Sequence, residues 1–248
     1  MSSTTPAHNR PVSGPAATAS AAAGSLTERR KAATRMEIAR AAAGLFVSRG
    51  LRATRAEDIA HTAGIAPRTF YRYFATKEES VAPLYAAGAE RWAEALRAAP
   101  PGLSVPEALD HAVRHTFTPG VGVSAASWEG VRTLVRLADA SPALGRVWAE
   151  VCRTGEGTLA EVLAVRLGRA APGEGENGGV PQGDNVAGCG DPEVSPALRF
   201  AAAVASAAVR VAVESWAAGD GPPDGPQGPA ALAVRNLEAL RDFRWTEL

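Results

Sequence analysis

The 248-residue sequence predicts an all-α protein, with a small N-terminal three-helix module followed by a larger helical domain. Two observations predict this class. Apolar residues recur every three or four positions, and the runs begin at Ser or Thr caps or at Pro and end at glycine. The N-terminal runs are also short and closely spaced, as in a helix-turn-helix flanked by further helices. We expect a disordered arm over 1–24, the module over 25–80 and the larger domain over 81–248.

Charge divides the chain in the same way, although 26 basic and 26 acidic residues balance overall. Residues 25–98 carry 13 basic and 8 acidic side chains, whereas residues 99–248 carry 12 and 18. A basic N-terminal part on an otherwise acidic chain indicates that the N-terminal part binds an anionic partner. No run of 18 apolar residues and no signal-peptide pattern is present, so we expect a cytoplasmic protein without a membrane partner.

The first predicted helix starts at a capping box, Ser25 to Glu28, in which hydroxyl and carboxylate each accept a backbone N–H. Apolar residues then fall on one face of a helix until Gly50 ends it. They are Ile38, Ala41, Ala42, Leu45 and Phe46.

A second capping box, Thr54 to Glu57, opens a short helix that ends before Gly64. Pro67 suits the first turn of the next helix, which is predicted to end near residue 75. A third box, Thr76 to Glu79, opens a longer helix that runs to about residue 98.

The rest of the chain also reads as helical, because Ser caps combine with Pro at or near the first turn. We place five more helices here. They cover 105–117, 124–139, 142–170, 196–218 and 229–243, with flexible loops over 172–194 and 219–228.

The third predicted helix has two different sides, since each residue turns the helix by about 100°. Phe70 and Phe74 lie on one side and can be buried. Arg68, Tyr71 and Arg72 lie on the other and project. Arginine can form two hydrogen bonds with guanine in a DNA major groove, which admits one helix. The alternative is that these arginines form an ordinary solvated face.

Lys77 is predicted to lie in the first turn of the fourth helix, where a cation is unfavourable unless an anion is near. A DNA phosphate would supply that anion. We therefore expect Lys77 to bind a phosphate.

The segment "IARAAAGLFVSRGLRATRAEDIAHTAGIAPRTFYRYFATKEE" resembles the DNA-binding domain of the TetR/AcrR family of bacterial transcriptional regulators. The resemblance implies base-facing positions at Pro67, Arg68, Thr69, Tyr71 and Arg72, and phosphate-facing positions at Thr54, Arg55, Tyr73 and Lys77. The sequence departs from the family pattern at Ala66, where Ser is common, and at Arg55, where Ser or Thr is usual.

The same resemblance implies that the larger domain binds a small molecule and forms a homodimer. The segment 195–219 is rich in Ala and Val on nearly every side, which requires burial on two faces. With the last helix it is similar to the helix pair of the family's four-helix dimer bundle. The alternative is that both helices complete the core of a monomer.

A loose further resemblance links 128–150 to family members with acyl-CoA-like ligands, so we expect a hydrophobic effector. Candidate pocket residues are apolar side chains with a few polar groups. They are Trp92, His111, His115, Phe117, Trp128, Trp148 and Cys152. The i, i+4 histidine pair could also bind a metal or be ordinary surface histidines. Without a third ligand we expect no metal and no cofactor.

Together these features predict a homodimeric repressor that binds a near-palindromic double-stranded DNA operator and is released by a small molecule. The alternative is a helical small-molecule-binding or enzyme domain that does not bind DNA. Motifs of hydrolases, zinc proteases and dinucleotide-binding enzymes are missing from the sequence, so we do not expect an enzyme.

Overall fold

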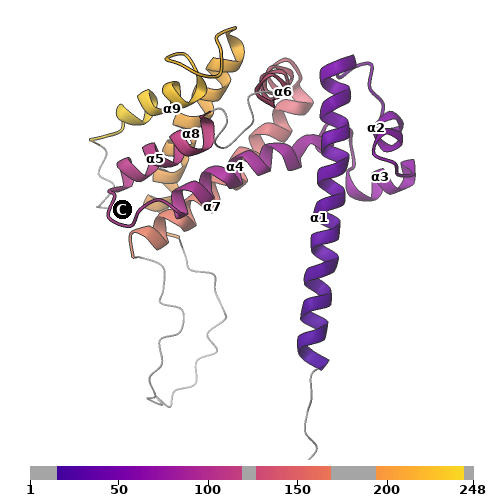
Figure 1. Cartoon of the computed structure of the whole chain (residues 1–248), viewed down its shortest axis with the longest axis horizontal. Coiled ribbons are helices and arrows are strands. Elements are labelled where there is room, and N and C mark those ends of the chain that lie inside the picture. The colour runs from indigo at the N-terminus through magenta and orange to yellow at the C-terminus, as the bar shows by residue number, and fades with distance from the viewer. Residues whose placement is uncertain (1–15, 119–126, 169–193, 243–248) are drawn as a thin grey trace, which may run out of the picture.

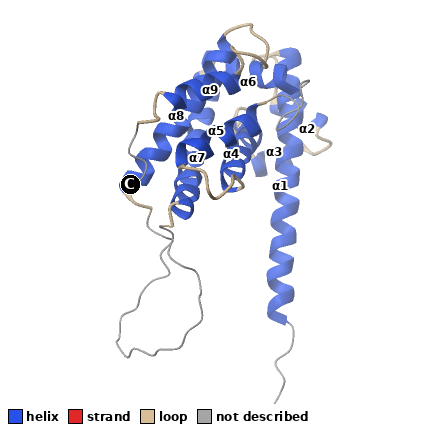
Figure 2. Cartoon of the chain, turned by 60° about the vertical axis from the view of Figure 1, so that its left-hand side comes forward, coloured by secondary structure: helices blue, strands red, loops and turns tan. Residues whose placement is uncertain are grey.

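The computed structural model describes residues 16–118, 127–168 and 194–242, which form helices and connecting turns without a β-strand (Figures 1 and 2). This confirms the predicted all-α class. The helices are α1 (Ala16–Arg49), α2 (Ala56–Thr62), α3 (Pro67–Tyr73), α4 (Ala82–Arg97), α5 (Val105–Phe117), α6 (Trp128–Ala140), α7 (Pro142–Arg166), α8 (Pro196–Ala218) and α9 (Pro229–Glu238), with the 3₁₀ turn η1 (Glu79–Val81) before α4.

Helix α1 is longer than the sequence predicts, because it begins at Ala16 and Ser25 lies inside it. The predicted start at Ser25 was therefore wrong. Alanine is frequent over 16–24 and has the highest helix propensity, which favours an early start. The rest of the predicted arm, 1–15, lies outside the described residues.

Two predicted capping boxes differ from the structure. Helix α2 is capped one residue later than expected, because the Arg55 N–H donates to the Asp58 carboxylate at 2.9 Å. At the box predicted from Thr76, the Glu79 N–H donates to the Thr76 hydroxyl at 3.2 Å, but the Glu79 carboxylate accepts from the Ala75 N–H at 3.0 Å instead of from Thr76. The helical turn that follows is η1 rather than α4.

The later helices lie where they were predicted, and some of them are shorter than predicted at one end. Helix α8 has the predicted bounds, whereas α7 stops at Arg166 because Gly168 adopts a left-handed φ of 66°. The start predicted for α6 lies in 124–126, and most of the loop 172–194 also lies outside the described residues.

Two large hydrophobic clusters organise the fold. One lies among α4, α5, α7, α8 and α9 and fills the larger domain. The other holds α2 and α3 against α1, and it also includes Leu134 and Ala138 of α6 and Leu144 of α7. Inside it the buried Tyr85 hydroxyl donates to the Leu134 carbonyl at 3.0 Å. The N-terminal module is thus packed directly on α6 and α7.

Helix α8 is long and apolar enough to cross a membrane by length and composition alone, with a mean hydropathy of 1.5 over its most apolar window. A core helix of a globular protein meets the same test. Here α8 packs between α7 and α9, and nine of its residues are buried. This packing accounts for the apolar residues on the buried face of α8.

The loop predicted to be flexible, 219–228, is fixed by side chains from three helices. The Trp216 indole donates to the Pro222 carbonyl at 3.1 Å, and Arg235 donates to the Pro226 carbonyl at 3.0 Å. Arg136 donates to the Gly219 carbonyl at 2.8 Å and to the Asp220 carboxylate at 2.8 Å. Long-range bonds of this kind cannot be read from a Gly/Pro-rich composition.

Phe70 is fully buried, so Phe70→Ala should lower the free energy of unfolding by about 3–5 kcal/mol. The neighbouring Tyr71 is 53% exposed and provides a matched control, with an expected loss below about 1 kcal/mol for Tyr71→Ala. Urea unfolding of both variants measures the difference. Equal losses would contradict the role of Phe70 as the anchor of α3.

Candidate nucleic-acid interface

Helix α3 is held in place by its two phenylalanines. Phe70 and Phe74 are buried in the cluster with Ile59 of α2 and Phe46 of α1, as predicted. Their rings lie 5.9 Å apart, and the Phe70 ring also meets the edge of Tyr71 at 5.4 Å. A helix of seven residues is too short to be stable alone, so this burial determines its orientation.

The start of α3 lacks a side-chain cap. Ala66 occupies the N-cap position in extended conformation, and Pro67 follows at the first helical position. Replacing a Ser cap by Ala costs about 1 kcal/mol, and Pro67 offsets part of this because its φ is already that of a helix. The tight turn before α3 depends on Gly64, whose φ of 69° is unfavourable for other residues.

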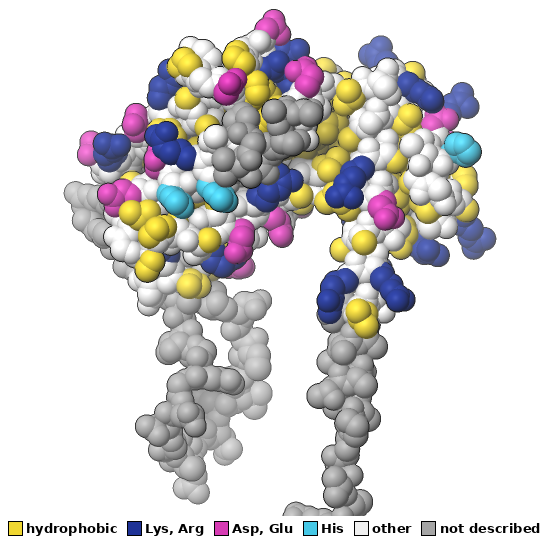
Figure 3. All heavy atoms as spheres, viewed as in Figure 1, with side chains coloured by type: hydrophobic (Ala, Val, Ile, Leu, Met, Phe, Trp, Pro, Cys, Tyr) yellow, Lys and Arg dark blue, Asp and Glu magenta, His cyan; other side chains and the backbone are white. Residues whose placement is uncertain are grey.

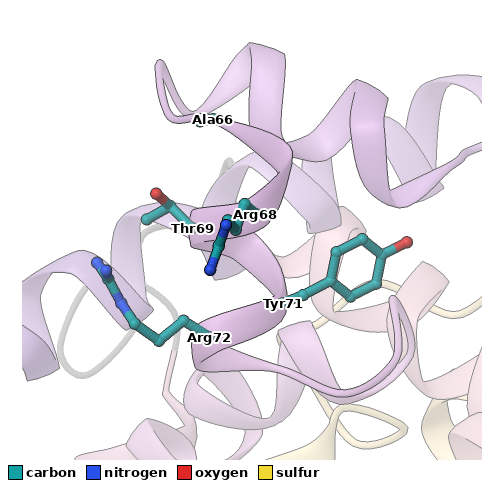
Figure 4. Close-up of a pocket in the computed structure, with 5 residues that line it drawn as sticks. All are labelled: Ala66, Arg68, Thr69, Tyr71 and Arg72. Carbon is teal, nitrogen blue, oxygen red and sulfur yellow. The ribbon is translucent and has the colours of Figure 1, made fainter.

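The predicted base-facing residues come together on the exposed side of α3. Pro67, Arg68, Tyr71 and Arg72 are exposed and Thr69 is half-buried. A shallow hollow is lined by Arg68, Thr69, Tyr71 and Arg72, together with Ala66 (Figure 4). Tyr71 and Arg72 leave the helix in opposite directions, with Arg68 and Thr69 between them. This face presents two guanidinium groups, a hydroxyl and a phenol to an incoming partner.

One contact in this face was not expected from the sequence. The Tyr71 hydroxyl donates to the carboxylate of Glu57 on α2 at 3.3 Å. The negative charge of Glu57, followed by slight desolvation and the hydrogen bond itself, raises the pKa of Tyr71 above 10.0. The two residues are 14 positions apart, and no local pattern in the sequence pairs them.

Two predicted phosphate contacts have other roles within the protein. Thr54 is buried, and its hydroxyl donates to the Gly50 carbonyl at 2.9 Å. The Lys77 amine donates to the carbonyls of Leu51 at 2.7 Å and of Thr54 at 2.8 Å. These two carbonyls explain why a cation lies at this position. A DNA phosphate, which we expected as its partner, is not needed to explain it. Lys77 has one further N–H donor to offer.

The other two predicted phosphate contacts lie at the surface of the module. Arg55 is exposed at the start of α2, and Tyr73 is half-buried at the end of α3. The Arg72 guanidinium lies 5.6 Å from the centre of the Tyr73 ring. Arg55 and Tyr73 thus flank the two short helices with groups that can donate hydrogen bonds.

The seven candidate effector residues do not form one group. His111 and His115 are exposed on α5, and Trp92 is buried in the core of the larger domain. Phe117 and Trp128 lie together, with ring centres 6.5 Å apart, and Trp128 also meets Trp216.

Trp148 and Cys152 form a further group on α7, next to α8. The Trp148 indole donates to the Glu214 carboxylate at 2.7 Å. Burial is the main cause that raises the pKa of the Cys152 thiol to about 11, so this cysteine is a thiol at neutral pH. Within the described ranges, no cluster of three or more His, Cys, Asp or Glu residues is arranged to hold a metal ion.

Comparison with known proteins agrees with this geometry. Residues 38–81 match the sequence model described as "Bacterial regulatory proteins, tetR family". The chain is also 30% identical over 148 residues to the HTH-type transcriptional regulator TcmR of Streptomyces glaucescens, a stretch that covers 58% of this chain and 64% of TcmR. The match thus spans less than two thirds of that relative. The similarity to the tetR family thus lies in the N-terminal module, where the match covers the end of α1 together with α2, α3 and η1.

Two solved structures of tetR-family proteins are similar to this chain. One is the FadR repressor of Thermus thermophilus in complex with lauroyl-CoA, with 22% identity, coverage of 83% of this chain and 92% of FadR, and a TM-score of 0.49. The other is a candidate regulator from Mesorhizobium loti, with 21% identity, coverage of 85% and 96%, and a TM-score of 0.49.

Glu57→Gln should lower the pKa of Tyr71 toward its ordinary value of 10.0, because the main cause of the rise is the Glu57 charge. The phenol would then ionise at lower pH. Ultraviolet titration of the variant, with Tyr71→Phe in the same background subtracted, isolates this tyrosine from the other two. Glu150→Gln on α7 is the control, and an equal shift there would contradict the pairing.

Proposed function

We propose that this protein is a sequence-specific DNA-binding transcriptional regulator in which α3 enters the major groove of its operator. The observation that carries the proposal is the exposed face of α3, with Arg68, Thr69, Tyr71 and Arg72 around one shallow hollow. The buried side of the same helix is fixed by Phe70. A helix held from behind and polar in front suits direct reading of base edges.

Each side chain of the face has a distinct role in the proposal. Arg68 and Arg72 donate pairs of hydrogen bonds to guanine O6 and N7. Tyr71 and Thr69 contact a thymine methyl or a neighbouring phosphate, and Pro67 presents an apolar edge at the tip of the helix. Glu57 holds the Tyr71 hydroxyl in its starting position.

Contacts to the phosphate backbone would come from the edges of the module. Arg55 and Tyr73 are the side chains proposed for this role, with the remaining donor of Lys77 as a third contact. Such contacts position a protein on DNA and carry no sequence information themselves. For Thr54, whose side chain is buried, only the backbone could take part.

The protein is further proposed to act as a homodimer through α8 and α9. Four residues of α8 repeat at helical spacing on one face, and two of them are exposed, Phe200 at 59% and Val211 at 45%. The others, Val204 and Ala207, are half-buried. An exposed apolar stripe of this kind suits a second copy of the chain. Two reading helices in a dimer would match adjacent turns of a near-palindromic operator.

We further propose that a hydrophobic small molecule bound in the larger domain regulates DNA binding. The indole N–H groups of Trp92 and Trp128 are buried and find no hydrogen-bond partner among the described residues. An unpartnered buried donor costs about 1–3 kcal/mol, which a bound molecule with an acceptor would recover. Binding of such a molecule beside these indoles would favour a state in which the two α3 helices of the dimer no longer match the spacing of the operator. The protein would then dissociate from the operator and repression would end.

Arg68→Ala and Arg72→Ala should each weaken binding to the operator by about 1–3 kcal/mol and relax sequence preference, because each removes a base contact. The operator is first selected from random DNA by the unchanged protein, and affinity is then measured at one fixed salt concentration. Arg153→Ala removes an exposed arginine of α7 and serves as the control.

The selection experiment also decides the proposal as a whole. Failure of the folded protein to enrich any sequence would contradict it and favour a helical domain that does not bind DNA. Enrichment followed by undiminished specificity of both variants would leave DNA binding intact but remove α3 as the reading helix.

A further inference from the structure

Helix α1 extends well beyond the module that it supports. Its 34 residues span about 51 Å, yet among the side chains that the structure describes, from residue 26 onward, the first that is buried is Ile38. The N-terminal turns of α1 project away from all other helices in both views (Figures 1 and 2). This projecting part is exposed along most of its described length, and packing within the chain does not explain it.

The projecting part of α1 is basic. Residues 26–35 contain four Arg or Lys side chains and one acidic residue, Glu28. Dark blue side chains are visible on this part of the helix and at the nearby edge of the module (Figure 3). A basic segment placed beside a basic module extends the same electrostatic surface.

Two of these cations face the reading helix. Lys31 and Arg35 share a helix face with Ile38 and Ala42, because the spacings are four, three and four residues. Ile38 and Ala42 lie in the cluster that buries Phe74, at the end of α3. The face of α1 that packs against α3 therefore carries Lys31 and Arg35 further toward the N-terminus.

A direct contact supports the placement of Arg35. The Arg35 guanidinium lies 4.8 Å from the centre of the Phe74 ring. The Glu28 carboxylate, by hydrogen bond and charge, is the main cause that raises the pKa of Lys31, and Tyr73 adds a smaller contribution. Arg35 therefore lies beside the end of α3, and Lys31 lies one helical turn before it on the same face of α1.

We infer that Lys31 and Arg35 form a second contact surface on α1 that binds the phosphates flanking the groove occupied by α3. This inference rests on the proposed function. It adds an element to the interface that lies outside the helix-turn-helix.

Neither cation is committed to another partner strongly enough to prevent this role. Lys31 pairs with Glu28 at 2.8 Å, but both side chains are more than half exposed, and such pairs contribute little. Within the described structure, Arg35 makes its ring contact and no hydrogen bond, so its N–H groups remain available. Duplex DNA fits this surface better than an acidic protein, because the surface is continuous with α3.

The decisive experiment compares two double variants on the DNA selected by the unchanged protein. Lys31→Gln/Arg35→Gln removes the proposed contacts, and Arg114→Gln/Arg153→Gln removes two exposed arginines from the larger domain. The slope of the logarithm of the binding constant against the logarithm of salt concentration should become shallower by roughly 2 for each protomer in the first variant. In the second variant this slope should not change. Sequence preference should not change, since phosphates carry no base information.

Glu28→Gln gives a result of opposite sign. Its carboxylate holds Lys31 and repels phosphate, so removing the charge should increase affinity and steepen the salt dependence. Arg35 also packs on Phe74, so thermal unfolding of each variant is measured first, and Lys31→Gln alone replaces the double variant if the latter is unfolded.

The outcomes separate this inference from the proposed function. Equal salt dependence of the two double variants, with intact operator binding, overturns the contact surface on α1 and leaves the reading helix unaffected. Absence of any selected DNA overturns both. A weaker salt dependence restricted to the α1 variant, with unchanged sequence preference, supports the inference.

Discussion

The N-terminal module depends on the burial of Phe70. The helix that carries this residue has only seven residues and no side-chain cap, so its own hydrogen bonds are insufficient to keep it folded. Packing of Phe70 and Phe74 against α1 and α2 provides the missing stability and also fixes which side of the helix faces outward. Stability and orientation of the polar face therefore have the same physical origin.

The same cluster connects the module to the rest of the chain. Leu134, Ala138 and Leu144 belong to it, although they lie in α6 and α7, and the buried hydroxyl of Tyr85 binds α4 to α6. Because such interiors are closely packed, displacement of α6 would change the support of α3. This junction makes the packing of α6 and α7 part of the support of the module.

Local patterns were sufficient to predict the parts of the structure that depend on local chemistry. The two sides of α3, the bounds of α8 and the glycine turn before α3 follow from helical spacing and backbone preference. The role of Lys77 could not be predicted in this way, because its acceptors are backbone carbonyls more than 20 residues away. The candidate effector residues were chosen by type alone, and the fold distributes them over separate places.

The arginines of α6 impose a further requirement on the larger domain. The Arg136 guanidinium reaches the Ala217 carbonyl at 2.6 Å as well as Gly219 and Asp220, while Arg132 lies 4.4 Å from the Trp216 ring centre and also donates to the Gly221 carbonyl. Arg136 thus satisfies the Ala217 carbonyl, which the end of α8 leaves open, and both arginines hold the loop that follows the helix. A lysine has neither the planar fork nor the reach for several such acceptors, so arginine and lysine are not equivalent at these two positions.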